Sequence, residues 1–102
     1  MGFSLYRTPQ FEEDYLLYFS YLKELSETVA VRHFLRFENA LVDELLEDPF
    51  RHAYFKETGA PYRAKLFKVG RKTFWIIYSI DEAAVTLHRF WDCSREPSTH
   101  GL

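Results

Sequence analysis

The chain has 102 residues, a usual size for one domain and too few for two ordinary ones. Hydrophobic residues make up 47% and aromatic residues 19%, enough for a substantial core, yet no apolar run approaches the roughly 18 residues of a membrane span. A single cysteine excludes an internal disulfide, and no secretory signal is visible at the start. We therefore expect one cytoplasmic domain over residues 1–102, without membrane association.

The net charge of −2 is unevenly distributed. Residues 1–60 carry six Lys and Arg against eleven Asp and Glu, whereas residues 61–102 carry seven against four. This asymmetry predicts an anionic partner for the C-terminal half, either nucleic acid or an acidic peptide. The pI near 6.1 argues against tight, non-specific binding to nucleic acid. Between Pro61 and Ile80 five basic residues occur without an acidic one: Arg63, Lys65, Lys68, Arg71 and Lys72.

The first half of the chain predicts a strand followed by two helices. Residues 3–7 alternate like a short strand. Thr8 is a suitable N-cap and Pro9 a suitable first residue for a helix over about 9–25. Ser26 caps a second helix, with an apolar face from Val31 to Leu46, which Pro49 ends. The connection between the two helices at Ser26 is short, which predicts an antiparallel helical hairpin. A sheet should cover the apolar surface that the two helices do not bury against each other.

The second half predicts a loop and three strands. Residues 49–61 contain Pro and Gly and form the loop, which its aromatic residues should hold against the domain. Strands follow at about 62–69, 73–80 and 84–91 with hairpin spacing, and residues 94–102 form a flexible tail. The middle strand is apolar on both faces, as a central strand is. The expected fold is α+β, in the order β-α-α-β-β-β, with the helical hairpin packed on a small, mainly antiparallel sheet.

Several side chains are candidates for a binding or catalytic role. Strand alternation places Arg63 and Lys65 on one face with Phe67, and Arg89 in phase with Val85 and Leu87. This pattern fits a cationic surface for phosphate or carboxylate groups, and equally a solvated strand face with a basic turn. Trp91, late on the last strand, is a better stacking candidate than Trp75, although packing is the more usual role for both.

Other polar residues favour no reaction. His88, Cys93 and His100 match no metal-ligand spacing, so we expect no metal site, and no motif indicates a cofactor. Cys93 has no adjacent base that would make it a nucleophile. Six acidic residues are expected on solvated helix faces: Glu12, Glu13, Asp14, Glu44, Glu47 and Asp48.

Several motifs resemble those of the RelE/ParE superfamily of toxins from prokaryotic type II toxin–antitoxin modules. They are the Thr8-Pro9 opening of the first helix, the hairpin with Val69-Gly70-Arg71 and Ile76-Ile77-Tyr78, and the ending Trp91-Asp92-Cys93-Ser94-Arg95. The resemblance covers about residues 4–97. It implies a cytoplasmic growth inhibitor, of the kind associated with plasmid stabilisation, that a cognate antitoxin wraps with an extended segment and holds in a joint complex that could be oligomeric.

The resemblance leaves the target open. RelE-like members are ribosome-dependent mRNA endoribonucleases that use Arg and Lys with a late Tyr or His, whereas ParE-like members bind DNA gyrase. Trp91-Asp92 stands where that Tyr or His is expected, which favours a ParE-like binder. The alternatives are a nuclease with Asp92 as base and a non-toxic relic that binds only its antitoxin. The candidate catalytic residues are Arg63, Lys65, Arg89, Asp92 and Arg95, and those for binding target or antitoxin are Arg63, Lys65, Lys68, Arg71, Lys72, Arg89, Trp91 and Arg95.

Overall fold

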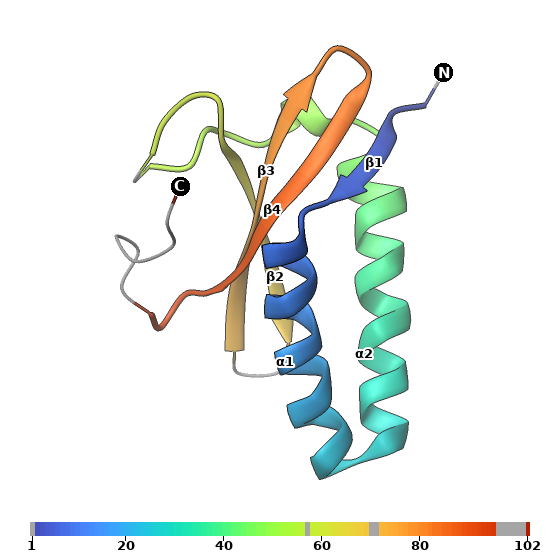
Figure 1. Cartoon of the computed structure of the whole chain (residues 1–102). Helices are drawn as coiled ribbons and strands as arrows, with labels where there is room; N and C mark the ends of the chain where they lie inside the picture. Colours follow the sequence, from blue (N-terminus) through green and yellow to red (C-terminus); the bar gives the residue numbers. More distant parts are fainter. Residues whose placement is uncertain (1, 57, 70–71, 96–101) are drawn as a thin grey trace.

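The computed structural model describes residues 2–56, 58–69, 72–95 and 102 (Figure 1). Its elements follow the predicted order β-α-α-β-β-β, and the predicted α+β fold is confirmed. In the described part of the chain, no helix has the length and hydropathy needed to cross a membrane. The elements are β1 (Ser4–Arg7), α1 (Pro9–Leu25), α2 (Glu27–Asn39), a π-helical turn (Ala40–Leu45), a 3₁₀ turn (Pro49–Arg51), β2 (Arg63–Val69), β3 (Lys72–Asp81) and β4 (Ala84–Asp92).

Both predicted helix starts are confirmed. The Thr8 hydroxyl accepts a hydrogen bond from the backbone N–H of Phe11 at 3.1 Å, and Pro9 occupies the first turn. The Ser26 hydroxyl accepts the N–H of Val29 at 3.3 Å in the same way. These caps satisfy donors that a helix cannot pair internally. The chain therefore reverses sharply at Ser26, and α1 and α2 run antiparallel side by side (Figure 1).

The second helix differs from its prediction. Its α-helical part ends at Asn39, and the chain continues as a wider π-helical turn in which the N–H of Leu46 donates to the carbonyl of Leu41 at 2.9 Å. The extra residue in this turn accompanies full burial of Leu41 and Leu45. The apolar face predicted from Val31 onward is only partly covered, because Val31, Phe34 and Leu35 remain exposed.

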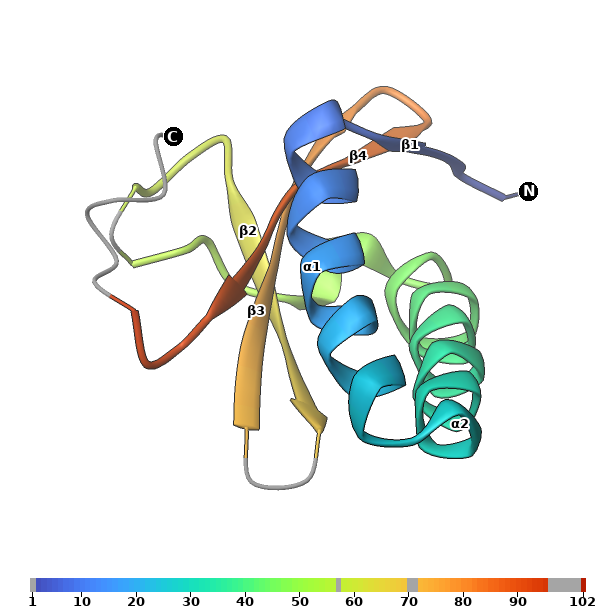
Figure 2. The ribbon, with the colours of Figure 1, turned by 60° about the horizontal axis from the view of Figure 1, so that its bottom comes forward.

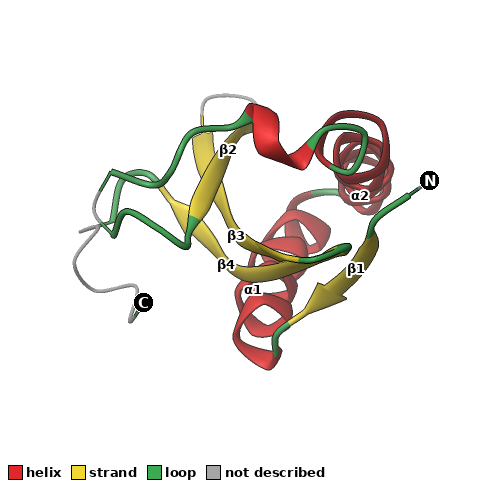
Figure 3. Ribbon diagram, turned by 90° about the horizontal axis from the view of Figure 1, so that it is seen from above, coloured by secondary structure: helices red, strands yellow, loops and turns green. Residues whose placement is uncertain are grey.

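The sheet has the strand order β1-β4-β3-β2. β1 pairs with β4 in parallel, and the other two pairings are antiparallel. The helices lie on one face of this sheet, as Figures 2 and 3 show from two directions. β3 is central and apolar on both faces, as predicted: Ile76 and Tyr78 point into the helix-covered core, and Ile77 packs with Phe55 on the other face.

A β-bulge changes the face of the sheet to which the side chains at the end of β4 point. Ile77 pairs with Arg89 whereas Tyr78 pairs with Leu87, so His88 is an extra residue on β4. An extra residue reverses the alternation of the side chains beyond it. Leu87 lies in the helix-covered core, and beyond the bulge Phe90 takes the core position. The prediction that Arg89 shares a face with Val85 and Leu87 is therefore wrong.

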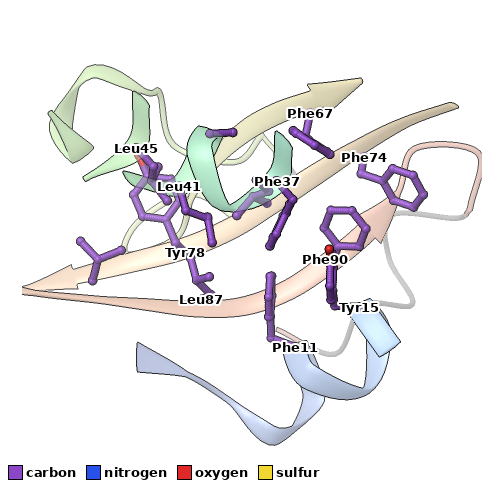
Figure 4. Packing of buried hydrophobic residues seen from close by; sticks show 13 residues of the cluster. Phe11, Tyr15, Phe37, Leu41, Leu45, Phe67, Phe74, Tyr78, Leu87 and Phe90 are labelled. Carbon is purple, nitrogen blue, oxygen red and sulfur yellow. The ribbon is translucent and has the colours of Figure 1, made fainter. Parts of the chain in front are cut away.

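Aromatic rings fill the space between the hairpin and the sheet (Figure 4). Phe37 of α2 is fully buried and contacts rings from three other elements. It stacks on Tyr15 with ring centroids 4.5 Å apart, and it meets Phe67 and Phe90 edge-on at 5.3 Å each. Such pairs add roughly 0.5–1.5 kcal/mol each beyond the area that they bury. This cluster fixes α1 and α2 against the sheet.

Candidate functional site

The structure does not gather the basic candidates into one surface. Arg63 and Lys65 lie near the start of β2, next to the 3₁₀ turn. Arg89 lies between β4 and α1. Lys72, Asp92 and Arg95 lie at the far end of the β3–β4 pair.

Arg63 holds the connection between the π-helical turn and β2. Its guanidinium donates hydrogen bonds to the carbonyls of His52 at 2.7 Å and Phe50 at 3.3 Å. It also lies over the ring of Tyr54, 4.3 Å from the centroid. Both hydrogen bonds come from the same terminal nitrogen of the guanidinium, and these contacts give Arg63 a role in positioning the loop. The predicted anchoring of this loop by aromatic residues takes this form, together with burial of Phe55.

Lys65 is buried, with 8% of its surface exposed. As predicted, it shares a face with Phe67, but that face is the one that the helices cover. Its ammonium group pairs with the Glu44 carboxylate at 3.2 Å. A buried lysine without such a partner would be costly, so Lys65 depends on Glu44, whose own side chain is 55% exposed. Lys65 therefore does not belong to an open cationic surface.

Arg89 and Asp14 form a bidentate ion pair between β4 and α1. Arg89 Nε lies 2.7 Å from Asp14 Oδ2, and a terminal guanidinium nitrogen lies 2.9 Å from Oδ1. Their side chains are only 11% and 7% exposed. Asp14 Oδ2 also accepts the backbone N–H of Phe90 at 3.1 Å. The expectation that Asp14 lies on a solvated helix face is wrong, because its carboxylate is buried against Arg89 and Phe90 of β4.

Lys72 and Asp92 close the end of the β3–β4 pair. Lys72 Nζ donates to Asp92 Oδ2 at 2.8 Å, and the Ser94 backbone N–H and hydroxyl donate to Oδ1 at 2.9 and 2.8 Å. Burial alone would raise the pKa of the Asp92 carboxyl, but these hydrogen bonds outweigh it and hold that pKa below its usual range. The same hydrogen bond raises the pKa of Lys72. Asp92 is thus an ionised acceptor, and a weak base.

A groove of about 410 Å³ runs between α1 and this end of the sheet. Two cations, Lys72 and Arg95, face two carboxylates, those of Asp14 and Asp92. The remaining surface is apolar or aromatic, and Leu17 and Tyr21 on its α1 side are 70% and 52% exposed. Among the residues that the structure describes, the lining consists of Asp14, Leu17, Tyr18, Tyr21, Lys72, Phe74, Phe90, Asp92 and Arg95.

Trp91 is not available as a stacking platform. Only 1% of its surface is exposed, and it packs with Ile77 on the sheet face that the helices leave uncovered. The guanidinium groups of Arg89 and Arg95 lie over its ring, 4.8 and 4.2 Å from the centroid. Trp91 therefore links the buried pair of Arg89 to the groove residue Arg95.

Two candidates remain. Lys68 is exposed on β2. Arg71 lies outside the described residues, as does most of the predicted tail beyond Arg95. The three described histidines, Cys93 and the described acids bring no three possible metal ligands together.

Sequence reasoning missed the aromatic wall of the groove. Tyr18 contacts Phe74 of β3, with ring centroids 4.5 Å apart. Tyr21 lies next to it, with ring centroids 6.5 Å apart. Burial, with smaller effects from Tyr21 and Asp92, raises the pKa of Tyr18, so its hydroxyl stays protonated. The sequence signal for this wall is Tyr21, a second tyrosine three residues after Tyr18 in the same helix.

The histidines give the fold a pH dependence. Burial lowers the pKa values of His33, His52 and His88 below the ordinary 6.5, and neighbouring cations add to the effect at His33 and His52. The unfolded chain therefore binds protons more readily, and acidification favours unfolding. We expect the free energy of unfolding, measured by urea titration, to fall as the pH drops from 7.5 to 5.5. The variant His52→Gln should lose less stability over this range, and equal slopes would contradict the assignment.

Comparison with models of known protein families and with curated protein sequences found no match to this chain.

Proposed function

We propose that this chain is the toxin of a type II toxin–antitoxin module and that it arrests growth by binding a protein target such as DNA gyrase, in the ParE-like manner. The family resemblance of the motifs motivates the proposal. The order of the elements, β-α-α-β-β-β, supports the proposal.

The observation that carries the binding mechanism is that three of the candidate cations have carboxylate partners within the chain. Lys65 pairs with Glu44, Arg89 with Asp14, and Lys72 with Asp92. Cleavage of RNA requires cations directed at the phosphate as charge develops on it. Cations already neutralised by carboxylates stabilise such charge poorly. This pairing favours binding over catalysis.

The groove along α1 is the surface that we assign to the partner. Its charged lining is balanced in sign, which suits a protein segment better than a polyanion. Tyr21 and Leu17 offer exposed apolar area beside the cation Arg95. Tyrosine and arginine are the residue types that most often dominate binding energy at protein interfaces. A segment with apolar and acidic side chains would complement this surface.

One observation favours the nuclease alternative. The Asp92 carboxylate and the protonated Tyr18 hydroxyl line the same groove as Lys72 and Arg95. In RNA cleavage by internal attack, the 2′-oxygen bonds to phosphorus as the bond from phosphorus to the 5′-oxygen breaks, which leaves a 2′,3′-cyclic phosphate. A carboxylate would take the 2′-hydroxyl proton, a phenol would protonate the departing 5′-oxygen, and the two cations would stabilise the charge on the phosphate. The experiment must therefore distinguish the two mechanisms.

The test expresses the chain from an inducible promoter and assays the purified protein in two reactions. For a ParE-like toxin we expect growth arrest and inhibition of DNA supercoiling by gyrase, with no new cleavage sites in toeprinting on translating ribosomes. Ribosome-dependent cleavage would replace the binding mechanism with the nuclease. Expression without arrest, together with inactivity in both reactions, would overturn the toxin proposal in favour of the relic.

Groove variants localise the activity. Tyr21→Ala and Arg95→Ala should each raise the inhibitory concentration by about 10-fold or more, the loss expected for an interface residue worth over 1.4 kcal/mol. Leu35→Ala and Arg32→Ala are matched controls, because both residues are exposed on α2 and neither lines the groove. Equal effects of groove and control variants would place the binding surface elsewhere.

A further inference from the structure

A second hollow lies on the sheet face opposite the helices. Its volume is about 210 Å³, and its lining is largely apolar. Among the described residues, it shares no lining residue with the groove along α1. The lining residues are Ala53, Tyr54, Phe55, Lys56, Ala64 and Trp75.

The backbone holds this hollow in shape. The segment before β2 runs beside the start of that strand, where Ala64 N–H donates to the Ala53 carbonyl at 3.2 Å and Phe55 N–H donates to the Tyr62 carbonyl at 2.8 Å. A β-bridge joins Tyr54 to Arg63 within this segment. The wall is thus an extension of the sheet, and the hollow exists before any ligand enters.

Its floor is aromatic around one small residue. Phe55 is 3% exposed and meets Trp75 edge-on, with ring centroids 5.6 Å apart. Ala64 lies on the same face of the sheet with a side chain of one carbon. Phe55 and Ala64 form a buried cluster with Ile77 and Trp91, and Trp75, which is partly buried, packs against this cluster. The missing side-chain volume at Ala64 leaves the space beside the two rings.

We propose that this hollow binds a small planar aromatic carboxylate. An apolar protein cavity of about 150 Å³ accepts benzene, so a hollow of about 210 Å³ accommodates a single ring with a substituent. Aromatic walls favour an aromatic occupant through edge and face contacts. Lys56 is exposed and supplies a cation among the described lining residues, which complements a carboxylate. This site is independent of the proposed toxin function.

The test is a titration of the full chain with 4-methylbenzoate, followed by two-dimensional ¹H–¹⁵N NMR, with 4-methylbenzamide as the neutral isostere. We expect saturable shifts of the Trp75 indole N–H and of the Ala64 amide, and at least 5-fold weaker binding of the amide. Lys56→Gln should weaken binding of the acid by a similar factor and leave binding of the amide unchanged. Lys68→Gln, an exposed lysine outside the hollow, is the matched control.

Ala64→Leu fills the hollow and should abolish binding of both compounds, with the dispersion of its spectrum reporting that it folds. If Ala64→Leu unfolds, the comparison of Lys56→Gln with Lys68→Gln still tests the proposal. Any of three results would overturn the proposal. They are chemical-shift changes that leave the Trp75 indole N–H unaffected, equal affinity for the acid and the amide, and equal effects of Lys56→Gln and Lys68→Gln.

Discussion

Replacing Asp14 by alanine is expected to lower the free energy of unfolding by about 3–5 kcal/mol, the usual cost of removing one partner of a buried ion pair. The substitution leaves the Arg89 guanidinium with 11% of its side chain exposed and without its bidentate carboxylate. It also removes the acceptor of the Phe90 N–H. Urea denaturation at pH 7.5 measures the difference.

Two comparisons separate this effect from the loss of a surface charge. Glu13→Ala removes the same charge from the neighbouring, exposed position of α1 and should change stability by no more than about 0.5 kcal/mol. The double variant Asp14→Leu with Arg89→Met should be more stable than Asp14→Ala, because no guanidinium is then left buried without the Asp14 carboxylate. A double variant as unstable as Asp14→Ala would contradict this account.

Replacing Phe37 by alanine is expected to cost a similar amount, about 3–5 kcal/mol, because it opens a cavity at the centre of the aromatic cluster. Phe37 is fully buried and contacts Tyr15, Phe67 and Phe90. Its loss removes both the buried area and the ring contacts that join α2 to α1 and the sheet. Thermal and urea unfolding of the variant measure the cost.

Leu35→Ala provides the control for this second prediction. Leu35 lies two residues away on α2 and is 57% exposed, so its truncation should cost less than about 1 kcal/mol beyond the small change in helix propensity. Similar losses for both variants would mean that Phe37 is not the centre of the core.

The order of elements could be predicted because local signals determine it. Thr8 with Pro9 and Ser26 satisfy helix N-termini with their own side chains, so a few neighbouring residues specify each start. Alternation along β3 likewise indicates a strand buried on both faces. The π-helical turn at Ala40–Leu45 and the bulge at His88 each add one residue to a regular repeat. Packing across elements decides such insertions, and no local pattern marks them.

The site was predicted less well for the same reason. The charges of Arg89 and Lys65 were visible in the sequence, but their partners Asp14 and Glu44 are distant along the chain. Asp14 also fits the ordinary preference for acids near the start of a helix, which concealed its contact with the sheet. A charged residue can therefore be identified from sequence, whereas its solvation and pairing follow from the tertiary fold.

The contact of Asp14 with Phe90 also bears on self-association. β1 covers β4 only along Ala84–Leu87, so the edge of β4 beyond that point could accept a strand from another molecule. There the Asp14 carboxylate accepts the hydrogen bond of the Phe90 N–H and places a negative charge at the edge. An incoming strand would have to displace the Asp14 carboxylate to pair with the Phe90 N–H. One helix side chain thus protects this edge of the sheet from aggregation.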